Sequence, residues 1–314
     1  MRSRLAPILV ALGTLAAAPL GPSPGTTAAG PRVTAILSYD AEPYQQALAG
    51  FRRELQGIVP GATVDVVAIH GDSTRLATAV AAVERDRPTL VFTLGTLATR
   101  GVLARVHGVP VVAGMVLNAS ELAAASNATG VFLEYPVEVE LRWLKRLLPK
   151  DRRVGVLYNS AENAARTAEA QRLAPLLELS IQAIRVEGPA ELPDALTTLS
   201  NRADVLWSVT DPVVYNGETA RTLLLFSLRN RIPLVGQSAA WVKAGALYAL
   251  DRDYADVGAQ CAGLAARIIG GEAAATLAPV PPRKVRYTVN GQTAAELRVS
   301  VPERVDGEAG EVID

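Results

Sequence analysis

The chain has 314 residues, with 31 basic and 31 acidic side chains, one cysteine and two histidines. This length suits two domains of ordinary size or one large one. A formal charge of zero argues against a nucleic-acid-binding protein, which needs a basic field to attract phosphates. A single cysteine excludes a disulfide framework and any site with several thiolates, and two histidines leave little material for a histidine-based metal cluster. We therefore expect no metal and no cofactor.

Residues 1–29 have the three parts of a secretory signal peptide. Arg2 and Arg4 form the positively charged N-terminal region, and residues 8–18 form an apolar run. Small residues ending at Ala29 fit a cleavage site. The alternative is a membrane anchor, but the run is too short to cross about 30 Å of hydrocarbon. We expect export to the periplasm with cleavage near Ala29. Removing a leader with two arginines and no acid leaves 29 basic and 31 acidic groups, a formal charge of −2.

The next part of the chain alternates short apolar runs with longer amphipathic ones. Such alternation is typical of β-α-β units that build a parallel sheet. Strands are expected at residues 33–38, 63–68, 90–93 and 109–113, and helices at 45–55 and 73–85.

The pattern restarts at Pro136. Glu138 and Glu140 fall in the first turn of a predicted helix, where acids complement the helix dipole, and Pro149 ends it. Strands are then expected at 153–158, 180–185, 204–209 and 233–235, helices at 164–177, 218–230 and 256–269, and after a proline-rich linker a last strand at 284–289. Cys261 falls in the small-residue helix, where we expect a buried free thiol.

A weak internal repeat suggests two similar lobes. The segment at 88–96 (PTLVFTLGT) leads through a helix to an x-Pro strand, and the segment at 203–211 (ADVLWSVTD) does the same. Two α/β lobes of roughly 120 residues would explain the repeat. The alternative is that any doubly wound sheet repeats this strand–helix–strand unit. In that case the internal repeat supports only the fold class.

The loops at the carboxyl ends of the predicted parallel strands hold the candidate site residues, because open α/β sheets bind ligands there. Among these loops, the one that contains Gly95 and Thr96 carries the most specific signal of a ligand site. Glycine lets the backbone approach a ligand, and the free N–H groups of the following helix suit a carboxylate. The alternative is that Thr96 only caps that helix. The other candidates in such loops are Ser38, Tyr39, Met115, Asn159, Asp211 and Ser238.

Asp211 lies in the corresponding loop of the second half. Its carboxylate could pair with a ligand ammonium while the Thr96 loop holds a carboxylate, which together would clamp a zwitterion. The alternative is a turn or cap role just before Pro212.

Six aromatic residues in or near predicted loops could line a ligand cleft, whereas Trp143 and Trp207 are better explained by packing. The six are Tyr39, Tyr44, Tyr158, Tyr215, Trp241 and Tyr254.

The evidence for an enzyme is thin. His70 and His107 lie outside the candidate loops, and the chain has no nucleophile elbow, zinc-protease motif or dinucleotide-binding glycine pattern. We expect a binding protein and no catalytic residues.

The chain resembles the exported substrate-binding proteins of ABC transporters in the TrpX-like group, which have the type I periplasmic binding protein fold. The resemblance covers nearly all of the chain after residue 29, and the order and spacing of its motifs carry it. These motifs are a Tyr44 to Phe51 opening helix, Leu94-Gly95-Thr96, Val109-Pro110-Val111-Val112, Asn127-Ala128-Thr129-Gly130-Val131, Leu147-Leu148-Pro149, Val154 to Asn159, Asp211, Arg231-Ile232-Pro233, Gly245-Ala246-Leu247, Tyr254 with Gly258, and Asn290 to Ala295. The chain departs from the pattern at Asn118-Ala119, where many relatives have an Asp-Pro pair.

The resemblance implies two Rossmann-like lobes with parallel sheets, joined by a hinge that the chain crosses three times. The lobes are expected to comprise residues 30–133 with 248–285, and 134–247 with 286–314. A ligand would bind between them, and the lobes would close over it. The residues expected to face the ligand are Ser38, Tyr39, Gly95, Thr96, Met115, Asn159, Asp211, Ser238 and Tyr254.

The function implied is that of a monomeric periplasmic receptor, which captures an amino acid or similar carboxylate and delivers it to an ABC permease in the inner membrane. One alternative is a periplasmic partner of a membrane sensor with the same fold and cleft. A weaker alternative is a secreted α/β enzyme, against which the missing nucleophile and base argue.

Overall fold

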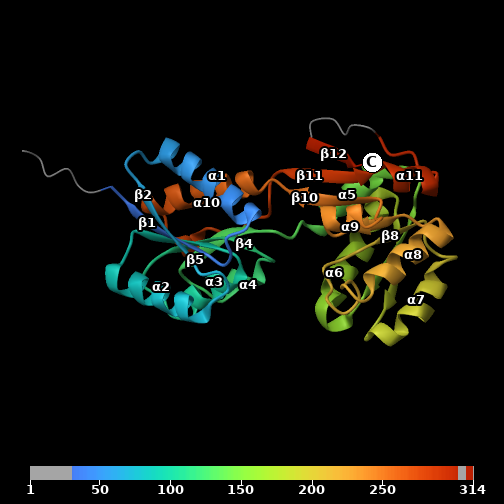
Figure 1. Ribbon diagram of the computed structural model, residues 1–314, viewed down its shortest axis with the longest axis horizontal. Coiled ribbons are helices and arrows are strands. Elements are labelled where there is room, and N and C mark those ends of the chain that lie inside the picture. The colour runs from blue at the N-terminus through green and yellow to red at the C-terminus, as the bar shows by residue number, and fades with distance from the viewer. Residues whose placement is uncertain (1–29, 303–308, 314) are drawn as a thin grey trace, which may run out of the picture.

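The computed structural model describes residues 30–302 and 309–313. The expected signal peptide at residues 1–29 lies outside the described residues. Among the residues described, no helix combines the length and the apolar character that a membrane span requires. The chain forms two α/β lobes that lie end to end and are joined by a narrow waist (Figure 1).

The first lobe has a five-stranded, entirely parallel sheet in the order β2-β1-β3-β4-β5. Its inner strands are apolar and buried, as expected for a sheet covered on both faces, whereas the edge strand β2 is largely exposed. Helices α2, α3 and α4 cover one face, and α1 and α10 cover the other (Figure 1). The elements are β1 Arg32–Leu37, α1 Glu42–Ile58, β2 Thr63–Ala68, α2 Ser73–Asp86, β3 Leu90–Leu94, α3 Thr96–Leu103, β4 Val111–Val116, α4 Ser120–Ala123, β5 Ala128–Phe132, α10 Tyr254–Ile269 and the 3-10 turn η3 Ala274–Thr276.

The second lobe has a seven-stranded sheet in the order β12-β11-β10-β9-β8-β6-β7, in which only β10 and β11 pair antiparallel. Trp143 and Trp207 are buried in its core, as the sequence predicts. The elements are α5 Val137–Leu147, β6 Arg153–Tyr158, α6 Ser160–Leu173, η1 Ala174–Leu177, β7 Ser180–Arg185, η2 Pro189–Glu191, α7 Leu192–Leu199, β8 Val205–Trp207, α8 Ala220–Asn230, β9 Leu234–Gly236, α9 Ala239–Lys243, β10 Tyr248–Arg252, β11 Val285–Asn290, α11 Gly291–Leu297 and β12 Ala309–Ile313.

The lobe boundary at residue 248 requires a correction. The sequence resemblance predicts that residues 248–285 belong to the first lobe, but β10 pairs with β9 and β11 in the second sheet. The chain returns to the first lobe only with α10. The pairing of Tyr248 with Val235 continues the parallel sheet of the second lobe, and this pairing fixes where the strand belongs.

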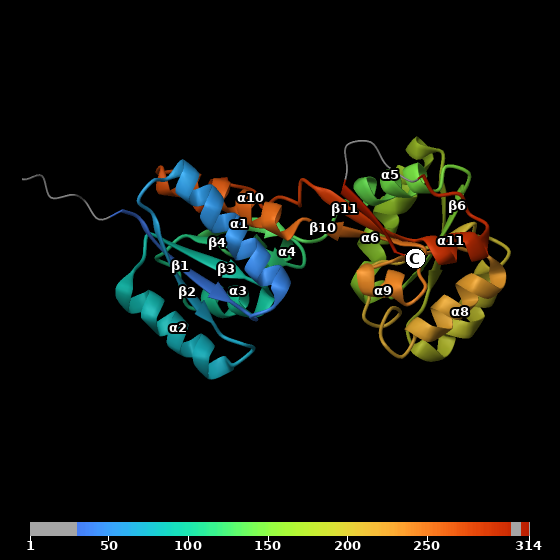
Figure 2. The same ribbon diagram turned by 45° about the horizontal axis from the view of Figure 1, so that its top comes forward.

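Close backbone contact holds α10 against α1 (Figure 2). A Cβ atom on Gly258 would lie 1.8 Å from the carbonyl oxygen of Ala47, and one on Gly50 would lie 1.9 Å from that of Ala255. Only glycine permits this approach. Cys261 of the same helix is a buried free thiol, as expected, and burial raises its pKa to about 12.

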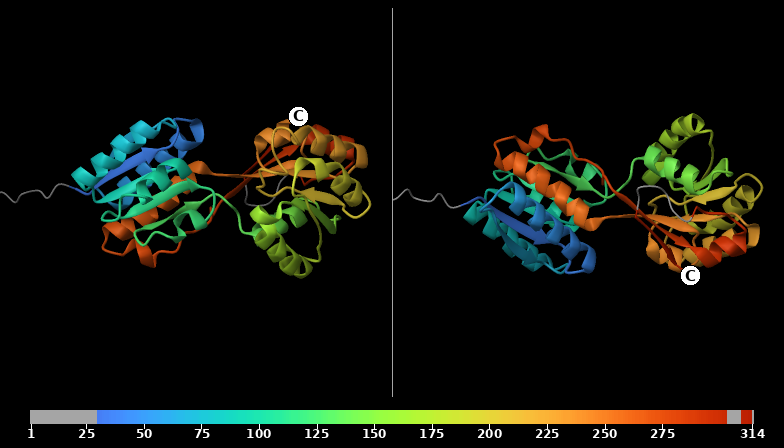
Figure 3. Two further views of the ribbon diagram at one scale, coloured as in Figure 1. Left: turned by 90° about the horizontal axis from the view of Figure 1, so that it is seen from below. Right: turned by 90° about the horizontal axis from the view of Figure 1, so that it is seen from above.

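The chain crosses between the lobes three times, after β5, after β10 and before β11 (Figure 3). Tyr135, on the first crossing, contacts both of the others. Its hydroxyl lies 2.8 Å from the carbonyl oxygen of Asp251 and 3.0 Å from that of Lys284, and it donates to them. Burial raises the pKa of Tyr135, so the hydroxyl keeps its proton and remains a donor. The expected three-stranded hinge is therefore organised around one buried side chain.

Candidate ligand-binding site

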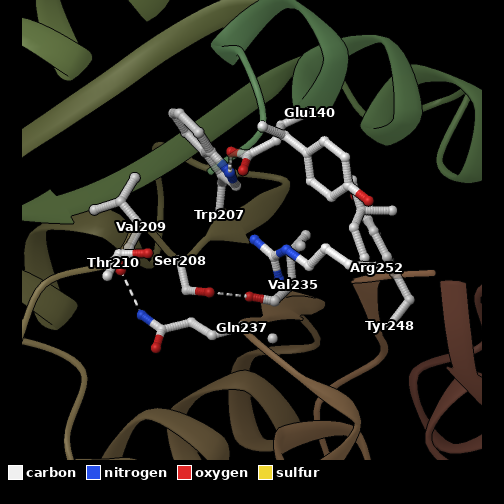
Figure 4. Close-up of a pocket in the computed structure, with 12 residues that line it drawn as sticks. Glu140, Trp207, Ser208, Val209, Thr210, Val235, Gln237, Tyr248 and Arg252 are labelled. Atoms are coloured by element: carbon white, nitrogen blue, oxygen red, sulfur yellow. Dashed lines mark hydrogen bonds between the residues drawn. The ribbon is translucent and has the colours of Figure 1, made fainter. Parts of the chain in front are cut away.

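A pocket opens in the second lobe beside the hinge (Figure 4). It lies where β8 and β9 end, which is where a parallel sheet is expected to bind a ligand. Its cavity volume is about 40 Å³, and it is partly open to solvent. Its walls combine aromatic rings with charged and amide side chains, namely Tyr135, Glu140, Trp207, Ser208, Val209, Thr210, Val235, Gly236, Gln237, Tyr248, Leu250 and Arg252.

An ion-pair network lies behind one wall of this pocket. Arg166 of α6 lies 2.8 Å from Oε2 of Glu140 and 3.1 Å from the carboxylate of Glu134. The indole N–H of Trp207 donates to the same Glu140 oxygen at 3.0 Å. Burial raises the pKa of the Glu140 carboxyl, while the positive charge of Arg166 acts in the opposite direction. Among the described residues, none makes a hydrogen bond to the other Glu140 oxygen, Oε1.

Arg252 enters the pocket from the hinge (Figure 4). Its Nε–H donates to the carbonyl oxygen of Leu133 at 2.8 Å, and its guanidinium lies 5.0 Å from the centre of the Tyr135 ring. These contacts hold the side chain by its inner nitrogen. Its two terminal nitrogens, Nη1 and Nη2, make no hydrogen bond within residues 30–302 and 309–313.

Hydrogen bonds to the backbone shape the loops at the bottom of the pocket. The Ser208 hydroxyl donates to the carbonyl oxygen of Val235 at 2.6 Å, and the Gln237 amide donates to that of Val209. The two loops, which follow β8 and β9, are therefore tied to each other (Figure 4).

The first-lobe residues predicted from sequence gather at the start of α3. Gly95 is its N-cap residue with a φ of +91°, and a Cβ atom there would lie 2.6 Å from the Ser38 hydroxyl and 2.9 Å from the Tyr44 ring. The Ser38 hydroxyl accepts the N–H of Ala98 at 3.0 Å, which satisfies one free donor of the helix. The suggestion that Thr96 caps the helix is wrong, because Thr96 is the first helical residue and makes no capping bond.

Two tyrosines stand beside this cluster. Tyr39 is 49% exposed and lies edge-on to Tyr44, with ring centres 6.0 Å apart. Tyr254 is partly buried and donates to the Asp251 carboxylate at 3.3 Å, and burial raises its pKa to about 12. Met115 has a φ of +60° at an irregular step of β4, and its side chain packs into the first-lobe core. Of these aromatic side chains Tyr39 is thus the exposed one, whereas Tyr44 and Tyr254 are partly buried against the first-lobe core.

Asp211 has a structural role that the sequence left open. The residue is 1% exposed. Its Oδ1 accepts the N–H groups of Val213 and Val214 at 3.0 Å each. Its Oδ2 accepts the N–H of Asn159 at 2.6 Å and the side-chain amide of Asn163 at 3.1 Å. These four donors occupy the acceptor positions of the carboxylate, so the geometry favours the turn role over an ammonium partner.

Asn159 and Ser238 begin helices of the second lobe. The Asn159 side chain caps α6 by accepting the N–H of Ala161 at 3.1 Å, and its amide donates to Glu187 at 3.0 Å. Ser238 is the N-cap residue of α9, without a side-chain capping bond. The structure thus brings Asn159 and Asp211 into direct contact, and separately groups Ser38 with Gly95.

The sequence does not single out Glu140 or Arg252 as pocket residues. Both flank the hinge, one at the start of α5 and one at the end of β10. The signal that could have identified them is the presence of opposite charges at two predicted crossings. In the described part of the chain, no three or more histidine, cysteine, aspartate or glutamate side chains are arranged to hold a metal ion.

Comparison with known proteins places these features in a family context. The sequence profile of the ABC transporter substrate binding protein family matches residues 32–313. A tyrosine-binding protein of Clostridioides difficile (strain R20291) is 20% identical over 223 residues, which cover 68% of this chain and 64% of the relative. The chain thus spans less than two thirds of that relative's length.

Solved structures share the architecture. A ligand-free, open substrate-binding protein with adhesive properties from Clostridium difficile has a TM-score of 0.74 at 18% identity. An ABC domain in complex with L-Trp from Streptococcus pneumoniae has a TM-score of 0.60 at 21% identity. Each match covers 90% of this chain and all of the other. The type I periplasmic binding protein fold implied by the sequence resemblance is confirmed.

Proposed function

Because the chain belongs to the ABC transporter substrate-binding protein family, we propose that it is an exported receptor that captures an amino acid between its lobes. The observation that carries this proposal is the pocket at the ends of β8 and β9. It lies beside a hinge organised by Tyr135. It combines aromatic walls with the terminal nitrogens of Arg252 and Oε1 of Glu140, which make no hydrogen bond among the described residues. A ligand bound there can contact the segments that must move when the lobes close.

The mechanism we propose is closure of the two lobes over the ligand. Open and closed states of such proteins differ by a few kcal/mol, so a ligand that contacts both lobes shifts the population toward the closed state. A micromolar receptor needs about −8 kcal/mol of binding free energy. Aromatic contact in the pocket and charge-assisted hydrogen bonds are sufficient for this.

The amino-acid class is supported by two relatives. One is described as tyrosine-binding, and a solved structure with the same fold holds L-Trp. The remaining steps follow the family: export with cleavage near Ala29, a monomeric receptor in the periplasm, and delivery of the ligand to an ABC permease. We infer no catalytic reaction, because the pocket offers no nucleophile paired with a base.

A thermal-shift screen of the chain from residue 30 tests the proposal. The twenty amino acids are compared with ribose, inositol and citrate at matched concentration. A binder raises the melting temperature in proportion to RT ln(1 + [L]/Kd). The expected result is a saturable shift with one amino acid or a small group of them. A shift only with a sugar, a polyol or citrate would contradict the amino-acid assignment.

A further inference from the structure

The hinge-side pocket contains charged groups of both signs, and most of their hydrogen-bonding atoms are already used. Arg166 lies between Glu134 and Glu140 and neutralises part of their charge. Arg252 supplies the second positive charge on this side of the pocket. The formal charges of these two acids and two arginines therefore balance. A pocket of this kind suits a ligand that also carries one charge of each sign.

Two sets of atoms remain available to such a ligand. Nη1 and Nη2 of Arg252 are unbonded among the described residues, and the Nε–H···O contact to Leu133 fixes the direction of the guanidinium. A guanidinium held in this way presents two parallel donors, which match the two oxygens of a carboxylate. Glu140 keeps Oε1 free, because Trp207 and Arg166 both contact Oε2.

Thr96 and Asp211 first suggested a zwitterion clamp, and of the two Asp211 is less available. Asp211 accepts four hydrogen bonds from its own lobe. The Ser38 hydroxyl is already bonded to the first turn of α3. Among the described residues that line the pocket, the charged side chains are those of Arg252 and Glu140, and each keeps atoms that a ligand can reach without breaking an existing hydrogen bond.

We propose that Arg252 binds the carboxylate of the ligand and Glu140 binds its ammonium group, so that the amino-acid head group lies in the second lobe against the hinge. This inference rests on the proposed function. It assigns the head group to two residues that flank the hinge, one in α5 and one at the end of β10. Because Arg252 is also bonded to Leu133 of the first crossing, a bound carboxylate contacts a side chain that links two of the three crossings.

The test uses ligands that lack one charge. Titration calorimetry compares the amino acid found in the screen with its amine, which lacks the carboxylate, and with its deaminated acid. For L-tyrosine these are tyramine and 3-(4-hydroxyphenyl)propionate, and for L-tryptophan they are tryptamine and indole-3-propionate. We expect Arg252→Gln to weaken binding of the amino acid by about 30-fold or more, as for a buried charge pair that loses one partner. The same variant should change binding of the amine less than about 3-fold.

Glu140→Gln should show the opposite pattern. We expect this variant to weaken binding of the amino acid by about 30-fold and binding of the deaminated acid by less than about 3-fold. The matched controls are Arg286→Gln, an exposed arginine on β11, and Glu138→Gln, which pairs with Arg142 on the surface of α5. Both controls should bind the amino acid like the wild type. Melting curves without ligand establish that all four variants are folded.

The outcomes separate the two proposals. If the wild type binds an amino acid and neither Arg252→Gln nor Glu140→Gln weakens it selectively, the head-group assignment is overturned and the receptor function stands. If a variant loses affinity equally for the amino acid, the amine and the deaminated acid, the assignment is also overturned, because such a loss indicates a general change in the pocket. If the wild type binds none of the twenty amino acids, the proposed function is overturned and the assignment falls with it.

Discussion

The hydroxyl of Tyr135 donates to the carbonyl oxygen of Asp251 at 2.8 Å, although the two residues are 116 positions apart in the chain. The same hydroxyl reaches Lys284 at 3.0 Å, so one buried side chain joins all three hinge crossings. The pocket lies directly beside this point, and Tyr135 forms part of its wall. Hinge and pocket therefore share a residue, which gives a physical route from ligand binding to lobe movement.

Tyr135→Phe removes the hydroxyl and keeps the ring. Two carbonyl oxygens in partly buried hydrogen bonds lose their donor, so we expect the free energy of unfolding to fall by about 1–2 kcal/mol. Urea denaturation measures this loss. A variant as stable as the wild type would show that the hydroxyl does not hold the crossings together.

Gly258→Ala tests the close contact of α10 with α1. The new methyl group would lie 1.8 Å from the Ala47 carbonyl oxygen, so the helices must separate, and we expect a loss of at least about 2 kcal/mol. Gly263 of the same helix has no atom within 4 Å of its Cβ position. Gly263→Ala is the matched control and should be neutral or stabilise by up to about 1 kcal/mol. Equal melting temperatures for the two variants would contradict the packing argument.

Asp211→Ala should act on stability. Four donors lose their acceptor, and three of them belong to the backbone, so we expect the free energy of unfolding to fall by about 3 kcal/mol. Chemical denaturation measures the loss, with Glu162→Ala on the exposed face of α6 as the control. A selective loss of affinity for ligands with an ammonium group, at unchanged stability, would instead support the earlier zwitterion role of Asp211.

Asp151 makes stability depend on pH. Burial and, to a smaller extent, the charge of Asp204 raise the pKa of Asp151 to about 6, from 3.8. The folded state therefore holds the proton more tightly than the unfolded state. The resulting penalty is nearly absent at pH 4, grows between pH 4 and 6, and is complete above pH 6.

Asp151→Asn removes this penalty. Because the side chain is half-buried, solvent screens part of the effect, and we expect a gain of roughly 1 kcal/mol at pH 8 and little gain at pH 4. Thermal denaturation at both pH values measures the difference. Asp65→Asn on the exposed strand β2 is the control. A gain that is the same at both pH values would refute this explanation.

The sequence predicts the fold well because runs rich in valine, isoleucine and leucine alternate with amphipathic helices, and this alternation leaves few other architectures. The sequence-based prediction fails at 248–252. This segment is expected to begin the return of the chain to the first lobe, but it pairs in the sheet of the second lobe. The sequence-based prediction also misses β12, because Ala309–Ile313 is short and contains a glycine.

The site is predicted less completely than the fold. The rule that ligands bind at the carboxyl ends of strands points to the loops after β8 and β9, and these loops line the pocket. Asp211 is identified as a notable loop acid, but its bond to Asn159, 52 positions away, is a tertiary contact that no local pattern reveals. Arg252 and Glu140 are missed for the same reason, since only the folded hinge brings them to one pocket.

The central claim is that the lobes close on an amino acid held beside the hinge. Small-angle X-ray scattering of the chain from residue 30, with and without a saturating concentration of the amino acid found in the screen, tests it most directly. The account predicts that the radius of gyration falls when that amino acid is added and does not change with ribose. Saturable binding of the amino acid with an unchanged radius of gyration would contradict it.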